Sequence, residues 1–148
     1  MTYSPLLPPV VALVAWTLIV CVWMALTRLP AMKKAGIDLG TLVGGRGANL
    51  EGVVPDRVQW KSHNYSHLLE QPTIFYAIVL TSALMGMDQP INVWLAWGYV
   101  GLRIVHSLIQ CTVNVVRYRF LVFLLATLCL VAITVHAALR VLHDCLGW

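Results

Sequence analysis

Four long apolar runs constrain this chain more than any other feature, because each can cross a bilayer as a helix. About 20 apolar residues span the roughly 30 Å hydrocarbon layer at 1.5 Å per residue. Of the 148 residues, 59% are hydrophobic and 11% are charged, whereas a soluble domain carries about a quarter charged residues. The sequence therefore predicts a single all-α integral membrane domain over residues 1–148, a four-transmembrane-helix bundle with spans at about 6–28, 63–87, 91–116 and 119–142.

The connections between the runs predict how the helices pack. The second and third runs are separated only by residues 87–90, and the third and fourth meet around residues 117–119. Helices joined by such short links must be antiparallel neighbours. The long first connection, about 31–62, is rich in glycine and is expected to be a loop. Its GGRG at 44–47 lacks the Lys and Ser/Thr of a phosphate-binding loop.

Basic residues are concentrated on one side of the predicted bundle. This bias sets membrane orientation, since cytoplasmic loops carry an excess of Lys and Arg. We therefore expect the long loop to be cytoplasmic and both termini to lie on the non-cytoplasmic side. The net charge of +4 follows from this topology, and no nucleic-acid partner is expected. The residues concerned are Arg28, Lys33, Lys34, Arg46, Arg57, Lys61, Arg117 and Arg119.

Polar residues interrupt the second and third runs at helical spacing. A charged group near the bilayer centre costs roughly 2.5–3.5 kcal/mol on insertion scales, so such groups usually face a protein interior or a wet cavity. Antiparallel packing brings both rows to the same half of the membrane, where they would line a pocket for an anionic ligand that also carries an amine. The first row is His63, His67, Glu70 and Gln71, and the second is Arg103, His106, Gln110 and Asn114.

Two other interpretations fit the same rows. The polar groups could pair among themselves, Glu70 with Arg103 for example, and hold the helices together. The protein would then be a non-catalytic membrane scaffold or a lipid-binding subunit. Alternatively, His63 and His67 are four residues apart and could share a metal with Glu70 and His106. Because nearby arginines would repel a cation, no metal is expected.

Short motifs in these rows resemble the MAPEG family (membrane-associated proteins in eicosanoid and glutathione metabolism). HLLEQP at 67–72 followed by FY at 75–76 resembles the family's second-helix signature. RIVHS at 103–107 and RYRF at 117–120 resemble its third helix and the turn into the fourth. The number of spans and the lengths of the connections also match, so the resemblance covers nearly the whole chain and points to a bacterial-type member.

The resemblance implies a membrane enzyme with glutathione as co-substrate. A homotrimer would hold glutathione between subunits near the cytoplasmic side of what we expect to be a bacterial inner membrane. Its activity would be that of a transferase or peroxidase acting on lipophilic electrophiles, which are small molecules taken from the lipid bilayer.

Residue roles follow from the same resemblance. Arg119 takes the position of the catalytic arginine that faces the glutathione sulfur, and Glu70 that of the glutamate that pairs with the glutathione amine. His63 and His67 stand where the family's enzymes usually have arginine and asparagine, and Gln110 stands where a tyrosine is expected. The glutathione-binding residues implied are Glu70, Arg103, His106, His67, Gln71, Gln110 and His63.

Overall fold

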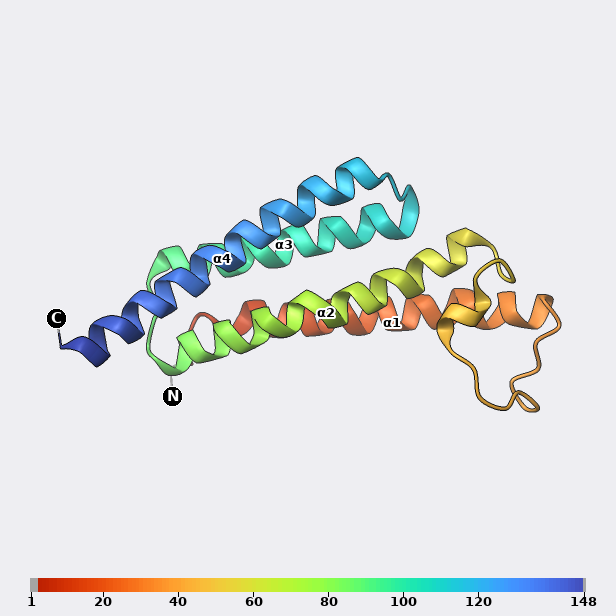
Figure 1. The fold of residues 1–148 in the computed structure, drawn as a ribbon, viewed down its shortest axis with the longest axis horizontal. Helices are drawn as coiled ribbons and strands as arrows, with labels where there is room; N and C mark the ends of the chain where they lie inside the picture. The colour runs from red at the N-terminus through yellow and green to blue at the C-terminus, as the bar shows by residue number, and fades with distance from the viewer. Residues whose placement is uncertain (1–2, 148) are drawn as a thin grey trace.

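The computed structural model describes residues 3–147, and within them four α-helices form an elongated bundle (Figure 1). No strand occurs in this part of the chain, and one turn of 3₁₀ helix lies in the first connection. The helices are α1 (Leu7–Lys34), α2 (Asp56–Leu84), α3 (Pro90–Thr112) and α4 (Val116–Leu146).

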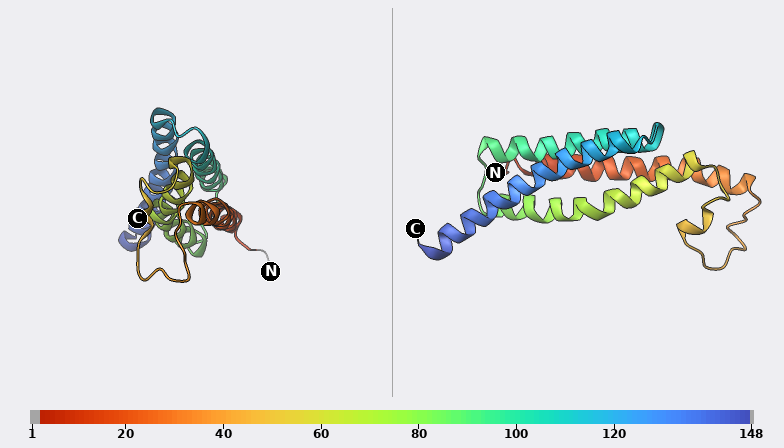
Figure 2. Two further views of the ribbon diagram at one scale, coloured as in Figure 1. Left: turned by 90° about the vertical axis from the view of Figure 1, so that its right-hand side faces the viewer. Right: turned by 45° about the horizontal axis from the view of Figure 1, so that its top comes forward.

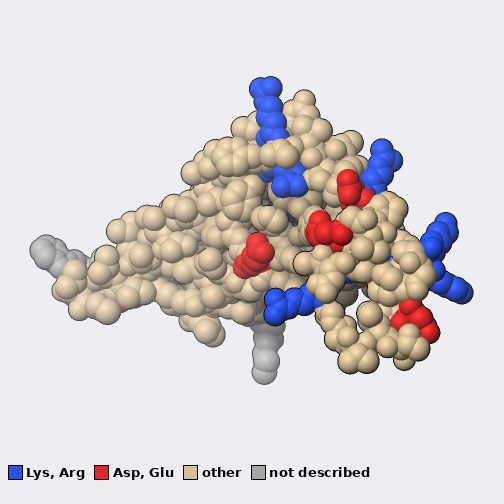
Figure 3. Space-filling view, turned by 45° about the vertical axis from the view of Figure 1, so that its right-hand side comes forward, with Lys and Arg blue, Asp and Glu red and all other residues tan. Residues whose placement is uncertain are grey.

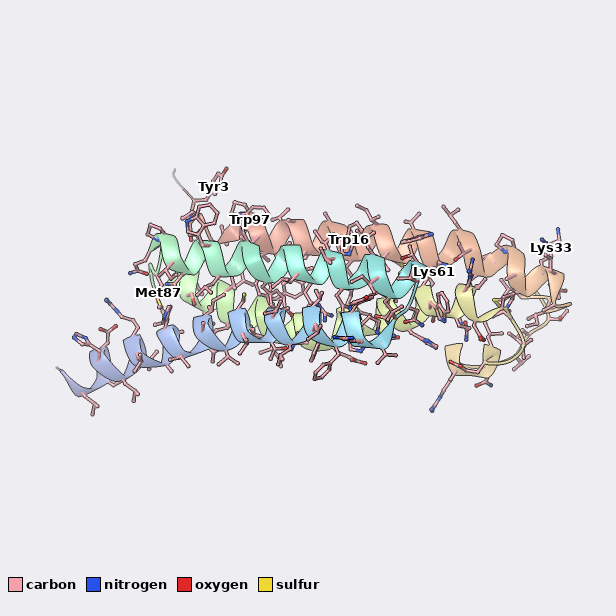
Figure 4. All side chains as sticks on the ribbon, turned by 90° about the horizontal axis from the view of Figure 1, so that it is seen from above. Tyr3, Trp16, Lys33, Lys61, Met87 and Trp97 are labelled. Carbon is pink, nitrogen blue, oxygen red and sulfur yellow. The ribbon has the colours of Figure 1, made fainter. Side chains whose placement is uncertain are left out.

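The helices pack as two antiparallel pairs. α1 lies mainly against α2 and α3 mainly against α4, as the views in Figures 1 and 2 also show. Both the α1–α2 connection and the α3–α4 turn lie at one end of the bundle, and both termini lie at the other. Figure 4 places Lys33 and Lys61 toward the connection end, and Tyr3 and Met87 at the opposite end.

Proline lies at or just before the first turn of three of the helices. Pro8 lies in the first turn of α1 and Pro90 is the first residue of α3, positions where the missing N–H has no helical partner anyway. Pro55 precedes α2 and Asp56 opens it, so a carboxylate faces the positive end of the helix dipole. Gly147 ends α4 in a left-handed conformation with φ 67°.

α1 continues past Pro30, where the expected span ended, and reaches Lys34. Proline deletes a single hydrogen bond, and the last turn is stabilised by packing, because Met32 is buried against Leu50 and Val54 of the connection. α2 also begins before the expected residue 63, so the connection covers residues 35–55 rather than 31–62.

The turn between α3 and α4 lies earlier than the sequence suggested. Asn114 adopts φ 53°, a left-handed conformation that ends α3, and its N–H donates to the Ile109 carbonyl at 2.7 Å. The link is therefore residues 113–115. Arg117 and Arg119, around which the link between the third and fourth spans was expected, belong to the first turns of α4.

Apolar side chains cover the outside of the bundle. Leu18, Trp94 and Leu128 are all more than half exposed, as are many other large apolar residues along the four helices. Two of the described helices, α1 and α4, are long and apolar enough to cross a bilayer by length and composition. Charged side chains gather on the half of the molecule that carries the connections (Figure 3). A continuous apolar surface of this kind fits contact with lipid.

The core between the pairs is apolar near the middle of the bundle. Phe75 of α2 and Tyr99 of α3 stack with ring centroids 4.4 Å apart and planes 10° apart. Leu13, Val79 and Ile133 are fully buried around them. This packing fixes the register in which the polar rows of α2 and α3 face each other.

A buried amide joins α3, α4 and the α2–α3 turn at the end that carries the termini. Asn92 Nδ2 donates to the Met87 carbonyl at 3.1 Å and to Gln89 Oε1 at 3.0 Å. Its Oδ1 lies 2.8 Å from Nδ1 of His136 on α4. Asn92 is buried, so water cannot reach its amide, and these protein groups satisfy its hydrogen bonds instead.

We expect Asn92→Ala to lower the free energy of unfolding by about 1–3 kcal/mol, because the buried Met87 carbonyl and the His136 ring lose their partner. Thermal melting of the detergent-solubilised protein, followed by circular dichroism, measures this change. Asn49→Ala in the exposed connection is the control and should change stability by less than about 0.5 kcal/mol. Equal melting of Asn92→Ala and the parent protein would contradict the assignment.

Candidate functional site

Arg103 is a fully buried cation inside the bundle. Its exposed fraction is 0%, and Nη2 donates to the backbone carbonyl of His67 on α2 at 2.6 Å. Pro72 lies five residues later in α2, and its missing N–H removes the helical bond to the carbonyl of Leu68, the residue after His67. Nε and Nη1 of Arg103 have no hydrogen-bond partner in the described chain. None of the ion pairs among residues 3–147 includes Arg103.

Two histidines and a phenylalanine meet beside Arg103. The His67 and His106 ring centroids are 5.6 Å apart, and the Phe123 ring of α4 lies 6.2 Å from His67 and 6.3 Å from His106. The Arg103 guanidinium carbon is 6.0 Å from the centre of the Phe123 ring. Thus α2, α3 and α4 each contribute one ring at a single level of the bundle.

Arg119 closes this group from the start of α4. With His67, His106 and Phe123 it lines a cavity of about 160 Å³, which Val116 and Phe120 also border. Its Nη1 donates to Oδ1 of Asn114, and its Nε is buried without a partner in residues 3–147. Val116 and Phe120 are more than half exposed on the outer surface, so the cavity lies at the boundary between the bundle and lipid.

Glu70 and His63 lie at the outer surface of α2. The Glu70 side chain is 66% exposed, and its Oε2 is 3.8 Å from Nδ1 of His67. His63 Nε2 lies 2.7 Å from Oε1 of Glu51 in the α1–α2 connection. The row read from the sequence is therefore divided, because His67 turns toward α3 and α4 whereas His63 and Glu70 face outward.

The two glutamines differ in their surroundings. Gln71 Nε2 donates to Thr127 Oγ1 on α4 at 3.0 Å, and the Tyr99 hydroxyl of α3 donates to Gln71 Oε1 at 3.3 Å. Gln71 therefore ties three helices together. Gln110 is buried on α3, and its Oε1 has no partner in the described residues.

Three further residues, one at the cavity and two fully buried in the bundle, were not singled out in the sequence. Phe123 follows Arg119 by four residues, a spacing that places both on one helix face and could have indicated it. Asn64 and Ser107 are fully buried, and their polar side-chain atoms lack partners in residues 3–147. Asn64 and Ser107 could have been noticed as small polar residues inside apolar runs.

The metal interpretation finds no support in the geometry. His63 is paired with Glu51 and turned away from His67 and His106. Across residues 3–147 no three or more His, Cys, Asp or Glu side chains are placed to hold a metal ion.

A larger hollow of about 310 Å³ lies between α1 and the connection, apart from the polar rows. Its Arg28 already donates to the Gly47 carbonyl at 3.0 Å and to Ser62 Oγ at 2.9 Å. A Cβ on Gly47 would lie 3.0 Å from Nη2 of Arg28, so a larger residue there would require the guanidinium to shift by a few tenths of an ångström. These contacts anchor the connection to α1 and α2.

The electrostatics of the site favour an anion. Arg103 and Arg119 bring two positive charges to one level of the bundle, and each retains a buried N–H group without a partner in the described chain. The nearest acid seen there, Glu70, is mostly exposed. A buried charge with no counter-charge is destabilising by several kcal/mol, which an anionic ligand would offset.

The match to a known family accords with this geometry. A sequence model of the MAPEG family matches residues 6–139, which covers all but the ends of the four-helix bundle. No curated protein and no solved structure matched the chain significantly. The prediction of an all-α membrane bundle of this kind is confirmed. The chain belongs to the MAPEG family, the membrane helical proteins of eicosanoid and glutathione metabolism.

Proposed function

We propose that this protein is a glutathione-dependent membrane transferase or peroxidase that acts on lipophilic electrophiles. The observation that carries the proposal is the pair of cations beside His67 and His106: Arg103 is fully buried and Arg119 is partly buried at the cavity, and neither forms an ion pair with a carboxylate in the described residues. Such a site suits a ligand that brings its own negative charge. A thiolate or a carboxylate of glutathione supplies that charge.

In the proposed reaction Arg119 acts on the sulfur. A thiol with a pKa of about 8.5–9 is mostly protonated at neutral pH, and only the thiolate attacks. A guanidinium close to the sulfur in a partly dry site favours release of the thiol proton to water. The thiolate then forms the carbon–sulfur bond as the leaving group departs from the electrophile with its bonding electrons.

Other residues would position the tripeptide. Glu70 is placed to pair with the glutathione amine, and Arg103 and His106 to meet an anionic or polar part of the ligand. His67 and Gln110 add imidazole and amide groups nearby. Gln71 acts through the packing of α2 against α3 and α4, since both ends of its amide are engaged. His63 becomes available if Glu51 is displaced.

A homotrimer would complete the site. The cavity of about 160 Å³ within one protomer is small beside the roughly 300–1,000 Å³ of typical ligand pockets. Glu70 and His63, two of the proposed ligand-binding residues, face outward from α2. A neighbouring subunit packed against this surface would enclose glutathione between the two chains.

The membrane placement follows from charge. The connection end of the bundle carries most of the basic residues, and Figure 4 shows Lys33 and Lys61 there. We place that end in the cytoplasm and both termini on the opposite side. The membrane would be a bacterial inner membrane, as the resemblance to a bacterial-type member implies. The lipophilic substrate would enter sideways from the bilayer past Val116 and Phe120, which border the cavity and are exposed.

We expect glutathione to stabilise the purified protein. At a ligand concentration about 100 times Kd, binding adds about 2.7 kcal/mol to the free energy of unfolding, and the melting temperature rises accordingly. A melting series with increasing glutathione measures this effect, and calorimetric titration gives Kd. The peptide Glu-Ala-Gly, which lacks the thiol and the γ-linkage, serves as the control ligand. A non-catalytic scaffold would show the same melting temperature throughout the series, and that result would refute the proposal.

A further inference from the structure

The conformation of Asn114 is unusual in this chain. Among residues 3–147 it is the single non-glycine residue with positive φ, at 53°. Ordinary side chains avoid this region, whereas glycine and asparagine tolerate it. The conformation ends α3 and starts the three-residue link 113–115 to α4. Glycine would adopt this positive φ equally well, so the presence of asparagine suggests that its side chain has a role of its own.

The Asn114 side chain points to such a role. Its Oδ1 accepts a hydrogen bond from Nη1 of Arg119, five residues later and one turn into α4. An arginine near a membrane boundary normally extends its charged head toward the lipid headgroups and water. Arg117, two residues earlier, is exposed in this way. The Arg119 side chain is instead partly buried, with its Nε inside the bundle.

We propose that Asn114 is a positioning residue that holds the Arg119 guanidinium at the cavity formed with His67, His106 and Phe123. The inference rests on the proposed function, in which Arg119 faces the glutathione sulfur. The short link makes Asn114 a rigid support, because a residue in the left-handed region between two helices has little freedom to move. A neutral amide is suited to this task, since it orients the cation without neutralising it. An aspartate would form an ion pair with the Arg119 guanidinium and so weaken its attraction for the thiolate.

Substitution by glycine separates the side-chain role from the backbone role. Asn114→Gly keeps the left-handed conformation and deletes the amide, so the fold and melting temperature should stay close to those of the parent. Asn114→Ala also deletes the amide but strains the backbone, so it should melt at a lower temperature. If Asn114 positions Arg119, both variants lose the same function although only one loses stability.

The first measurement concerns Arg119 and needs no ligand. The Nε–H signal of Arg119, assigned by its loss in Arg119→Lys, is recorded by ¹⁵N NMR of the full-length protein in detergent. In the parent protein its exchange with water should be slow, and in Asn114→Gly it should be about tenfold faster or more, because the buried N–H becomes accessible. An unchanged exchange rate in Asn114→Gly would overturn the inference whatever the protein does with glutathione.

The second measurement concerns the bound thiol. The ultraviolet absorbance of glutathione thiolate, titrated with pH, gives the pKa of the thiol on the enzyme. Asn114→Gly should raise that pKa by about one unit and lower kcat about tenfold, with KM for glutathione changed less than about twofold because the other contacts remain. In an Arg119→Ala background Asn114→Gly should have no further effect, since the residue acts through Arg119.

The two measurements distinguish the possible failures. A parent protein with a protected Arg119 signal but no bound thiolate would refute the proposed function and leave the positioning of Arg119 intact. A parent protein with bound thiolate whose pKa does not change in Asn114→Gly would refute the inference alone. Equal effects of Asn114→Gly in the presence and absence of Arg119 would also refute it, since they would indicate a general structural role.

Discussion

Arg119→Ala is expected to lower kcat/KM for conjugation of a chlorinated nitrobenzene with glutathione by about 10²–10³-fold. Removal of one group that stabilises a reacting anion typically has an effect of this size. The guanidinium lines the cavity between α2, α3 and α4, where it is partly shielded from water. Without it the bound thiol should titrate near its solution pKa, and turnover at neutral pH should fall with the thiolate fraction.

The matched control for this experiment is Arg117→Ala. Arg117 belongs to the same helix turn and carries the same charge, but it is exposed and does not line the cavity. Its removal should change kcat/KM less than about threefold. Both variants should retain the melting temperature and oligomer size of the parent. Full activity of Arg119→Ala would exclude this residue from the mechanism, and equal losses in the two variants would indicate a general effect of charge.

Arg103→Met should maintain or raise the stability of the ligand-free protein and abolish its stabilisation by glutathione. In the ligand-free protein it removes a buried cation whose burial costs several kcal/mol, at the expense of one hydrogen bond to the His67 carbonyl of about 1.5–3 kcal/mol. We therefore expect the ligand-free variant to melt at the same temperature as the parent or higher. Glutathione should no longer stabilise it, because the ligand's negative charge has lost its partner.

Thermal melting with and without glutathione tests this prediction, and Arg140→Met is the control. Arg140 is exposed, and its Nε lies 3.0 Å from Oδ2 of Asp144, far along α4 from the site. Its replacement should leave both the ligand-free melting temperature and the glutathione response unchanged, since exposed ion pairs contribute little. If Arg103→Met unfolds readily and still responds to glutathione, Arg103 is a structural residue of the α2–α3 contact and not a ligand-binding one.

Helical spacing was sufficient to predict that part of the two polar rows would meet. Arg103, His106 and Gln110 are separated by three and four residues, and all three are buried on the inner face of α3. The short α2–α3 turn forces antiparallel packing, which brings His67 beside His106. Both results follow from a period of 3.6 residues and a link too short for any other arrangement.

Spacing did not predict which residues at the edge of a row face inward. His63, His67 and Glu70 share one face of α2 in sequence, yet only His67 turns toward the other helices. The direction depends on where α3 and α4 cross α2, which is determined by contacts such as Phe75 with Tyr99. The helix ends could not be predicted from the sequence either. For example, α1 continues through Pro30 because Met32 packs against the connection.

Residue order along the chain was therefore enough to establish a membrane bundle of four helices and a cationic level within it, since hydrophobic length and helical period are local properties. The enclosure of Arg119, its contact with Asn114 and the outward position of Glu70 required the folded chain. These features depend on crossing angles and on a left-handed residue between α3 and α4, and both are decided by packing between segments distant in sequence.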